Sequence, residues 1–176
     1  MKIEPILTER LMLRGFTKED ALWAFHIWND PEMGRYLPDK AMEEIDPEYL
    51  KLLESLGDDP ECCYLIPIRR DTQEPVGTCS WMERDGAIDL AYCVHKDFWN
   101  QGYATEMAHG MIEYARSQGA KRVTIYVNQG NAASRKVAEK MRRADRRRKH
   151  PPKTGNRSDD PGISVRYSAV TTIPLR

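Results

Sequence analysis

The sequence lacks any long apolar run and any targeting leader. Its apolar stretches are broken by charged residues well before the roughly 18 residues that a membrane span requires. No positively charged segment followed by an apolar one opens the 176 residues. We therefore expect a soluble, cytoplasmic protein with no membrane partner. The length suits one domain, or one domain with a tail, and is sufficient to bury a core.

Cysteine is scarce, and its few copies do not have the spacing of a metal site or a disulfide framework. The four residues lie in or beside apolar, strand-like runs: Cys62, Cys63, Cys79 and Cys93. No pair follows the C-x-x-C spacing, and no paired histidines lie nearby. We expect buried, reduced thiols and no metal.

The sequence also lacks net charge, but this neutrality hides a gradient along the chain. Its 27 basic residues balance 27 acidic ones. Residues 1–60 carry a net charge of -7, residues 61–120 of -4 and residues 121–176 of +11. The chain therefore consists of an acidic part followed by a strongly basic one.

Hydrophobic periodicity predicts a mixed α/β domain. Alternating apolar residues favour strands, and apolar residues spaced by three and four favour helices. The expected elements are a strand at 8–16, helices at 17–28 and 48–56, strands at 62–69, 76–82 and 87–94, a helix at 104–115, a strand at 122–127 and a helix at 131–141. Residues 142–161 are basic with almost no apolar side chains, so we expect a loop there, before a strand-like alternation at 163–169.

A turn before the best amphipathic helix has the features of a phosphate site. It lies within Trp99-Asn100-Gln101-Gly102-Tyr103-Ala104-Thr105-Glu106. A helix start leaves backbone N–H groups unpaired at the positive end of the helix dipole, and small residues let an anion approach the backbone. Many helices begin with a small residue, so the turn alone does not establish a ligand.

Further motifs lie before and after this turn, and their order along the chain is informative. Asp89-Leu90-Ala91-Tyr92-Cys93-Val94 precedes it, and Asn131-x-x-Ser134 with Lys140 follows it. Together with the opening Thr8-Glu9-Arg10-Leu11-x-Leu13-Arg14, they resemble the GNAT acyltransferase superfamily over residues 5–141. The resemblance is greatest to the subgroup containing the ribosomal-protein N-terminal acetyltransferases. It implies a central mixed, mostly antiparallel sheet with helices on both faces and a strand splay that receives CoA.

The resemblance also implies an N-acetyltransferase that uses acetyl-CoA as co-substrate and a primary amine as acceptor. The pyrophosphate would lie on the backbone amides of Gln101, Gly102, Tyr103, Ala104 and Thr105. The pantetheine arm would lie against the backbone of Cys93 and Val94 and contact Asn131, and Ser134 would face the thioester sulfur. An ordinary alternative for Asn131 is a helix N-cap, and for Ser134 a small core-facing hydroxyl; both are compatible with the functional roles.

Two catalytic residues follow from the same resemblance. Asp89 occupies the position of the subgroup's strand glutamate, a proposed base that would act through water. Its short side chain and ordinary pKa near 3.9 make it a weak base unless it is desolvated. The alternative is a solvated strand carboxylate. Ser134 is the candidate for protonating the leaving thiolate, with a backbone N–H near Val94 as oxyanion donor.

The chain departs from the family at three places. Trp99 stands where the superfamily's turn motif has Arg or Gln, as it often does in this subgroup. Asn100 replaces the usual glycine, which Asn tolerates because it adopts left-handed backbone more readily than most residues. Arg142 and Arg143 replace the Gly-Phe that leads into the final hairpin. We therefore divide the chain into a GNAT-like domain, 1–141, and an atypical basic segment, 142–176, whose last strands are rebuilt or truncated.

Two alternatives remain open. In one, the basic run makes the chain a binding module for RNA or another polyanion. That run is Lys140, Arg142, Arg143, Arg146, Arg147, Arg148, Lys149, Lys153 and Arg157. No aromatic side chain is interleaved for base stacking, so a nucleic-acid partner is not our expectation. In the other, the fold binds CoA without catalysis. A homodimer and the identity of the acceptor are also left open; acidic residues at 39–48 would favour a cationic amine.

Overall fold

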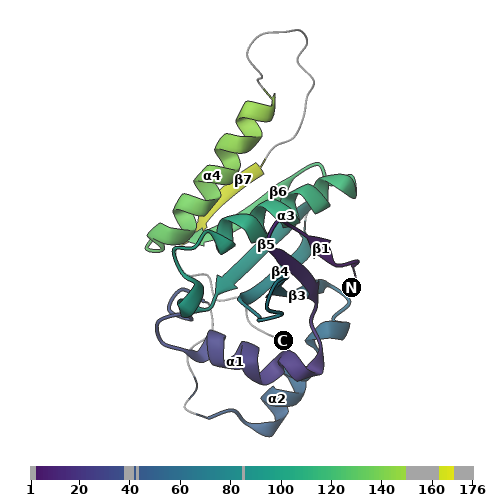
Figure 1. Cartoon of the computed structure of the whole chain (residues 1–176), viewed down its shortest axis with the longest axis vertical. Coiled ribbons are helices and arrows are strands. Elements are labelled where there is room, and N and C mark those ends of the chain that lie inside the picture. Colours follow the sequence, from purple (N-terminus) through teal and green to yellow (C-terminus); the bar gives the residue numbers. More distant parts are fainter. Residues whose placement is uncertain (1–2, 38–41, 43, 85, 150–162, 169–176) are drawn as a thin grey trace.

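A computed structural model describes residues 3–37, 42, 44–84, 86–149 and 163–168 of the chain. In this part the structure has a seven-stranded sheet with the strand order β1-β2-β3-β4-β5-β6-β7 (Figure 1). The strands are β1 (Ile6–Leu7), β2 (Leu11–Gly15), β3 (Cys62–Arg69), β4 (Gly77–Arg84), β5 (Ala87–Val94), β6 (Val123–Asn128) and β7 (Ile163–Ser168). All neighbours from β1 to β5 are antiparallel, whereas β5–β6 and β6–β7 are parallel. The predicted mixed, mostly antiparallel sheet is confirmed.

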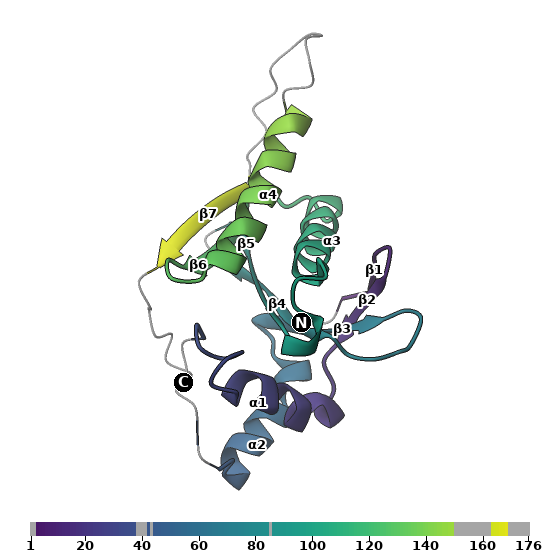
Figure 2. The same ribbon diagram turned by 60° about the vertical axis from the view of Figure 1, so that its left-hand side comes forward.

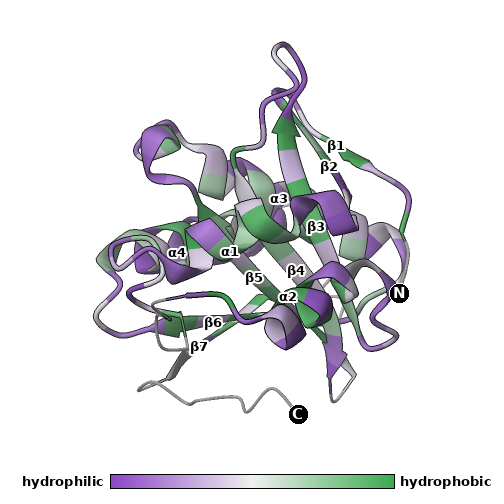
Figure 3. Cartoon of the chain, turned by 90° about the horizontal axis from the view of Figure 1, so that it is seen from below, coloured by the Kyte–Doolittle hydropathy of each residue, from purple (hydrophilic) through white to green (hydrophobic). Residues whose placement is uncertain are grey.

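Four α-helices cover the two faces of this sheet. They are α1 (Ala21–Asn29), α2 (Pro47–Glu54), α3 (Tyr103–Ser117) and α4 (Ala132–Lys149). One hydrophobic core joins α3 and α4 to the strands, and a second joins α1 and α2 to the opposite face of β3. Figure 2 shows α1 and α2 together on one side of the molecule, away from α4 and β7. Seen from below in Figure 3, α1 and α2 cross in front of strands that carry long hydrophobic stretches.

Local sequence signals account for most helix boundaries. Thr17 and Asp20 form a capping box ahead of α1. Asp46 accepts hydrogen bonds from the first backbone N–H groups of α2, and Pro47 occupies its first position. Gly119 has a φ of 82° just beyond α3, as expected for a glycine that ends a helix. Within the described residues, no helix is both long and apolar enough to cross a membrane.

The structure corrects the prediction for the basic segment. Residues 142–149 are not a loop but continue α4, which runs eight residues past its expected end at Met141. Arg, Lys and Ala all favour helix, and the apolar stripe is replaced by charged residues that pair with α3. Residues 150–161 lie outside the described part of the chain. The division into 1–141 and 142–176 stays a prediction, and α4 crosses that boundary.

The strand after the basic segment has an orientation that the sequence did not predict. β7 pairs in parallel with β6, in register from Val123↔Ile163 to Asn128↔Ser168. Among the described residues after 141, β7 is the only strand. Within the described residues α4 is thus followed by a parallel strand that completes a seven-stranded sheet, and the rebuilding or truncation of the last strands stays a prediction.

Candidate active site

The parallel strands β5 and β6 separate at one end of their pairing. Their register runs from Ile88↔Val123 to Leu90↔Ile125 and stops there. β5 continues to Val94 along β4, and the end of β6 continues along β7. Past Leu90, the edge of β5 that faces β6 has no strand partner among the described residues, so backbone groups there, the Val94 N–H among them, can meet an amide-bearing ligand. This is the predicted splay.

The predicted phosphate turn leads from the end of β5 into α3. Asn100 and Gly102 both have left-handed backbone, with φ of 61° and 84°. The first backbone bond of α3 runs from the N–H of Glu106 to the carbonyl of Gly102, over 3.1 Å. The N–H groups from Gly102 to Thr105 therefore have no acceptor within the helix. Because α3 has fifteen residues, these donors also lie at the positive end of a long helix dipole.

Trp99 connects this turn to the splay. Its indole Nε1 donates to the carbonyl oxygen of Val94 over 2.7 Å, and its side chain is 37% exposed. Gln101 Nε2 donates to the carbonyl oxygen of Asp97 over 2.9 Å within the same turn. The aromatic residue at position 99 thus has a structural role at the end of β5.

A clamp from the N-terminal strands holds the first turn of α3. Glu106 Oε1 accepts from the Thr8 hydroxyl over 2.6 Å and from the Arg10 backbone N–H over 2.7 Å. Arg10 Nε donates to Glu106 Oε2 over 2.7 Å. Burial raises the pKa of Glu106, but the hydrogen bonds from Thr8 and Arg10 outweigh it, and the net shift is downward. Glu106 is therefore charged and ties the start of α3 to Thr8 and Arg10, a role that the sequence did not predict.

Arg10 also contacts the turn itself. Its Nη1 donates to the carbonyl oxygen of Gln101 over 3.0 Å, and its guanidinium lies 4.2 Å from the centre of the Tyr103 ring. Tyr103 is buried, with 5% exposure. The opening motif of the sequence contains Thr8 and Arg10, but only the fold shows that they support the turn.

The start of α4 lies on the other side of the gap. Asn131 Oδ1 accepts the backbone N–H of Ser134 over 3.0 Å, so Asn131 is the N-cap of α4. Ser134 Oγ lies 3.0 Å from the hydroxyl of Tyr92, which reaches across from β5. Tyr92 was part of the quoted motif, but its contact with Ser134 was not predicted.

The two predicted catalytic residues lie on opposite faces of the sheet. Asp89 is half-buried and pairs in register with Met82 and Thr124, just before the splay begins. It shares a face with Cys93, whose Sγ donates to the Met33 carbonyl over 3.8 Å. Tyr92, with Ser134, lies on the face covered by α3 and α4. A ligand in the gap would thus have Asp89 on one face and Ser134 on the other.

Residues 30–37, which follow α1, border the gap on the face of Asp89. Asp30 Oδ2 accepts from Lys96 Nζ over 2.8 Å, just after β5. The Tyr36 hydroxyl donates to the Gly130 carbonyl over 3.0 Å, just before α4. This segment therefore contacts both sides of the gap. The hydrogen bond from Lys96, together with backbone N–H donors, lowers the pKa of Asp30 to about 2.

The four cysteines are all free thiols, as predicted. Cys93, beside the gap, is half-buried, and the other three are buried. Burial raises the pKa of Cys62 to about 11 and that of Cys93 to about 12. Both are therefore protonated near neutral pH, and neither is in its nucleophilic form. Among the described residues, no group of three His, Cys, Asp or Glu side chains is arranged to hold a metal ion.

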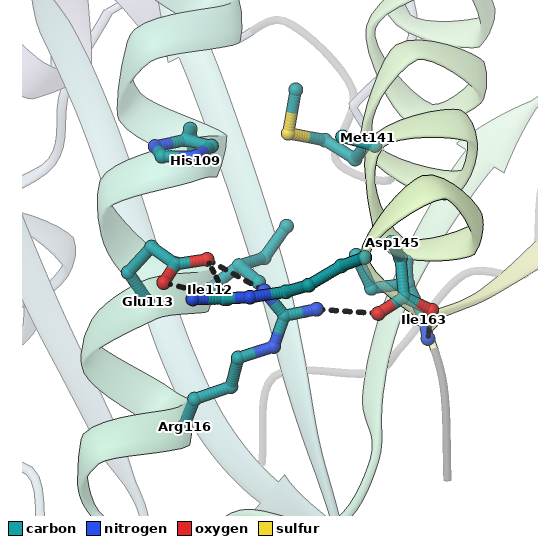
Figure 4. Close-up of a pocket in the computed structure, with 9 residues that line it drawn as sticks. His109, Ile112, Glu113, Arg116, Met141, Asp145 and Ile163 are labelled. Atoms are coloured by element: carbon teal, nitrogen blue, oxygen red, sulfur yellow. Dashed lines mark hydrogen bonds and ion pairs between the residues drawn. The ribbon is translucent and has the colours of Figure 1, made fainter. Parts of the chain in front are cut away.

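A pocket of about 250 Å³ lies elsewhere, between α3, α4 and β7 (Figure 4). Arg116 donates to Glu113 and to Asp145, each over 2.5 Å, and Arg148 lies 2.9 Å from Glu113. Asp145 is buried and also accepts from the backbone N–H of Ile163 over 3.3 Å. This network joins α3, α4 and β7. The lining of the pocket also includes His109, which is exposed.

The described geometry fits a CoA thioester: an unpaired strand edge suits the amides of a pantetheine arm, and the turn suits its pyrophosphate. Comparison with known proteins agrees. "Uncharacterized N-acetyltransferase p20" of Bacillus licheniformis is 25% identical over 145 residues, which cover 79% of this chain and 82% of that protein. A solved GNAT-family acetyltransferase from Bacillus anthracis superposes with a TM-score of 0.69 at 19% identity, covering 78% of this chain and 81% of that one.

Ribosomal-protein acetyltransferases are among the proteins of similar fold. RimL, a ribosomal L7/L12 alpha-N-protein acetyltransferase solved in complex with coenzyme A, has a TM-score of 0.65 at 17% identity. The match covers 78% of this chain and 82% of RimL. The acetyltransferase (GNAT) domain family matches residues 10–142, which is most of the sequence. The chain therefore belongs to the GNAT acetyltransferase family, whose members use acetyl-CoA.

Proposed function

We propose that the chain transfers the acetyl group of acetyl-CoA to a primary amine, either a protein N-terminus or a small amine, by direct attack. The observation that carries this proposal is the gap that opens between β5 and β6 after the pair Leu90↔Ile125. The turn before α3 lies at one end of this gap, and the start of α4 lies beside it. The family supplies the co-substrate, and the residues around the gap supply the chemistry.

We assign acetyl-CoA to the turn and the gap. The pyrophosphate lies on the amides of Gln101, Gly102, Tyr103, Ala104 and Thr105. The pantetheine arm hydrogen bonds to the strand edge at Cys93 and Val94, and Asn131 contacts it from the start of α4. Support comes from the unpaired N–H groups at the start of α3 and from the loss of strand pairing past Leu90.

Direct attack by the amine is favoured over an acyl-cysteine intermediate. Cys93 is the thiol nearest the gap along β5, and its raised pKa keeps it protonated. In the proposed step the amine nitrogen forms a bond to the acetyl carbon and the carbon–sulfur bond breaks. The amine loses one proton, which Asp89 accepts through a water molecule and returns to solvent. Ser134 donates one proton to the departing sulfur and regains it from solvent. The Val94 backbone N–H is the proposed oxyanion donor.

The cost of deprotonating the amine bears on the acceptor. A lysine-like amine with a pKa of about 10.4 is neutral in roughly one molecule in 2,500 at pH 7, a penalty of about 4.6 kcal/mol. An α-amine with a pKa near 7.8 loses only about 1 kcal/mol. Since a weak base suffices for the second case, an α-amine is the acceptor that we favour.

The acidic segment at 39–48 is less closely linked to the gap than the sequence suggested. Asp46 is the N-cap of α2, and the neighbours of α2 are α1 and the short helical turns at Lys18–Asp20 and Leu56–Asp58. Asp39 and Glu43 lie outside the described residues. The exposed residues Glu32 and Arg35, in the segment that borders the gap, are therefore the better candidates for contact with an acceptor.

Thiol release from acetyl-CoA tests the proposal across polyamines, aminoglycosides and peptides with free N-termini. We expect turnover with at least one class, and tight binding of acetyl-CoA without an acceptor. Binding without turnover for every class would favour the alternative of a CoA-binding protein that lacks catalysis. Failure to bind acetyl-CoA would overturn the proposal.

The polyanion-binding alternative has one structural observation in its favour. Arg142 and Arg143 are exposed on α4, so part of the basic run is accessible. Arg148 is already paired with Glu113, and Lys153 and Arg157 lie outside the described residues. Titration with fluorescent RNA at two salt concentrations tests this alternative, since phosphate contacts weaken steeply with salt.

We place the enzyme in the cytoplasm, with the four free thiols as support, because unpaired cysteines are typical of a reducing compartment. A homodimer remains a proposal, and measurement of the molar mass in solution tests it.

A further inference from the structure

The hydroxyl groups of Tyr92 and Ser134 meet across the gap between β5 and α4. The two oxygens lie 3.0 Å apart, and the Tyr92 oxygen is also 3.4 Å from the Ser134 carbonyl. Tyr92 lies two residues past Leu90, where pairing with β6 ends. The pair therefore lies at the splay itself, on the face covered by α3 and α4.

The Ser134 hydroxyl is not taken up by its own helix. A serine in a helix commonly donates to the carbonyl four residues earlier, which here is that of Gly130. That oxygen already accepts the N–H of Ala132 over 3.1 Å and the hydroxyl of Tyr36 over 3.0 Å. A carbonyl oxygen has two lone pairs, and both are occupied. In the described part of the chain, the hydrogen-bonding partner of the Ser134 hydroxyl is Tyr92.

Tyr92 is suited to donating this hydrogen bond. Burial raises the pKa of its phenol, and the hydrogen bond with Ser134 offsets only part of that rise. The phenol therefore keeps its proton at neutral pH and can donate it, and of its two acceptors Ser134 Oγ, at 3.0 Å, is nearer than the Ser134 carbonyl oxygen, at 3.4 Å. When Tyr92 donates to Ser134 Oγ, the hydrogen of Ser134 is left for another acceptor.

We propose that Tyr92 is a positioning residue that donates to Ser134 Oγ and so directs the Ser134 hydrogen toward the sulfur of acetyl-CoA in the gap. This inference rests on the proposed function, in which Ser134 faces that sulfur. Without the phenol, the hydroxyl of Ser134 can rotate, and its hydrogen no longer has a fixed direction. Tyr92 itself need not touch the substrate.

A binding experiment tests the inference without turnover. The probes are CoA and desulfo-CoA, which lacks the sulfur, measured by calorimetry at a pH above the pKa of the CoA thiol, where that thiol is mostly thiolate. We expect the wild type to bind CoA about tenfold more tightly than desulfo-CoA, the order expected for one hydrogen bond to a charged group. Tyr92→Phe and Ser134→Ala should each lose most of this preference and keep the affinity for desulfo-CoA.

The double variant shows whether the two residues act together. If Tyr92 acts through Ser134, Tyr92→Phe causes no further loss of preference in a Ser134→Ala background. The same cycle applies to kcat with a confirmed acceptor, whereas the KM for acetyl-CoA should stay unchanged. Tyr126→Phe is the matched control, since it removes an exposed tyrosine hydroxyl from the neighbouring strand β6.

Several outcomes would overturn the inference while leaving the proposed function intact. In the first, the wild type turns over acetyl-CoA but binds CoA and desulfo-CoA with equal affinity. In the second, Tyr92→Phe keeps the wild-type preference for CoA. In the third, the losses of preference in Tyr92→Phe and Ser134→Ala multiply in the double variant, which would mean that the two residues act independently. Loss of desulfo-CoA binding in Tyr92→Phe would instead assign the phenol to general packing of the gap. Failure of the wild type to bind either probe would remove the proposed function itself.

Discussion

Arg10 and Glu106, 96 residues apart in the sequence, form a hydrogen bond of 2.7 Å that joins the N-terminal strands to the first turn of α3. The same guanidinium donates to the Gln101 carbonyl and lies over Tyr103. Arg10, which is far from the turn in the sequence, therefore supports the turn that we assign to the pyrophosphate.

Replacing Arg10 by Gln should weaken binding of acetyl-CoA by about tenfold, because the turn loses a charge-assisted support worth roughly 1–3 kcal/mol. S-acetylpantetheine, which has no pyrophosphate, should bind the variant and the wild type alike. Arg143→Gln, which breaks an exposed ion pair with Glu139 on α4, is the control. Equal losses for both thioesters would mean that Arg10 supports the whole gap and not the turn.

The left-handed backbone of Gly102 predicts a cost for any side chain there. Gly102→Ala should lower the free energy of unfolding by roughly 1–2 kcal/mol through its φ of 84°, and weaken acetyl-CoA binding further. A Cβ would lie at an ordinary 3.5 Å from Arg10 Nη2, so backbone strain and not a clash is the cause. Gly15→Ala is the control, since no atom lies within 4 Å of its added Cβ. Urea unfolding and calorimetry measure the two effects, and equal stabilities would contradict the argument.

Asp89 is the proposed base, and the prediction separates the effect of its charge from that of its side-chain length. Asp89→Asn should reduce kcat by about a hundredfold or more, the lower end of the range for loss of a general base, with little change in the KM for acetyl-CoA. Asp89→Glu carries the residue found in the subgroup and should retain activity. Steady-state kinetics with a confirmed α-amine acceptor measure kcat and KM for both variants. An Asn variant as active as the wild type would show that solvent takes the proton.

The ion-pair network between α3 and α4 should stabilise residues 142–149, for which the sequence predicts a loop. Asp145→Asn leaves Arg116 with a weaker partner and should cost about 2–3 kcal/mol, since the Asp145 side chain is only 7% exposed. Arg143→Ala removes an exposed residue 3.9 Å from Glu139 and should cost almost nothing. Urea unfolding gives both values. Similar losses for the two variants would contradict a specific role for the buried pair.

The ion pair of Asp30 and Lys96 predicts a pH-dependent difference in stability. Because the pKa of Asp30 is lowered from 3.8 to about 2, its contribution is present above pH 3.8 and is lost as the pH falls toward 2. Wild type should therefore melt at a higher temperature than Asp30→Asn at pH 6, and the difference should disappear near pH 2. Glu32→Gln, an exposed neighbour, is the control. A difference that does not vary with pH would rule out the ion pair as its source.

The turn before α3 and the helix starts were predictable from the sequence because their signals are local. Gly102, Asn131 and the capping residue Asp46 lie where short-range backbone geometry requires them, and their spacing identified the turn and the helix starts. The limits of β3 and β5 also agree with the alternation of apolar residues. The sheet class and the GNAT membership followed from these elements in order.

The failure at residues 142–149 has a physical reason. The segment lacks an apolar stripe, so it was read as a loop. Its side chains at the spacing of one helix face, Met141, Ala144, Asp145 and Arg148, line the pocket against α3. Asp145 and Arg148 pair with Arg116 and Glu113 there, and charge pairing replaces apolar burial. The spacing was present in the sequence, but the partners lie 29 and 35 residues away.

The sequence by itself thus determined the local elements, the turn before α3 and the N-cap of α4, since each depends on residues a few positions apart. Only the tertiary structure decided the parallel docking of β7, the clamp of Arg10 on Glu106 and the contact of Tyr92 with Ser134. Each of these joins groups separated by about 40 residues or more, and no periodicity within one segment encodes which of them will meet.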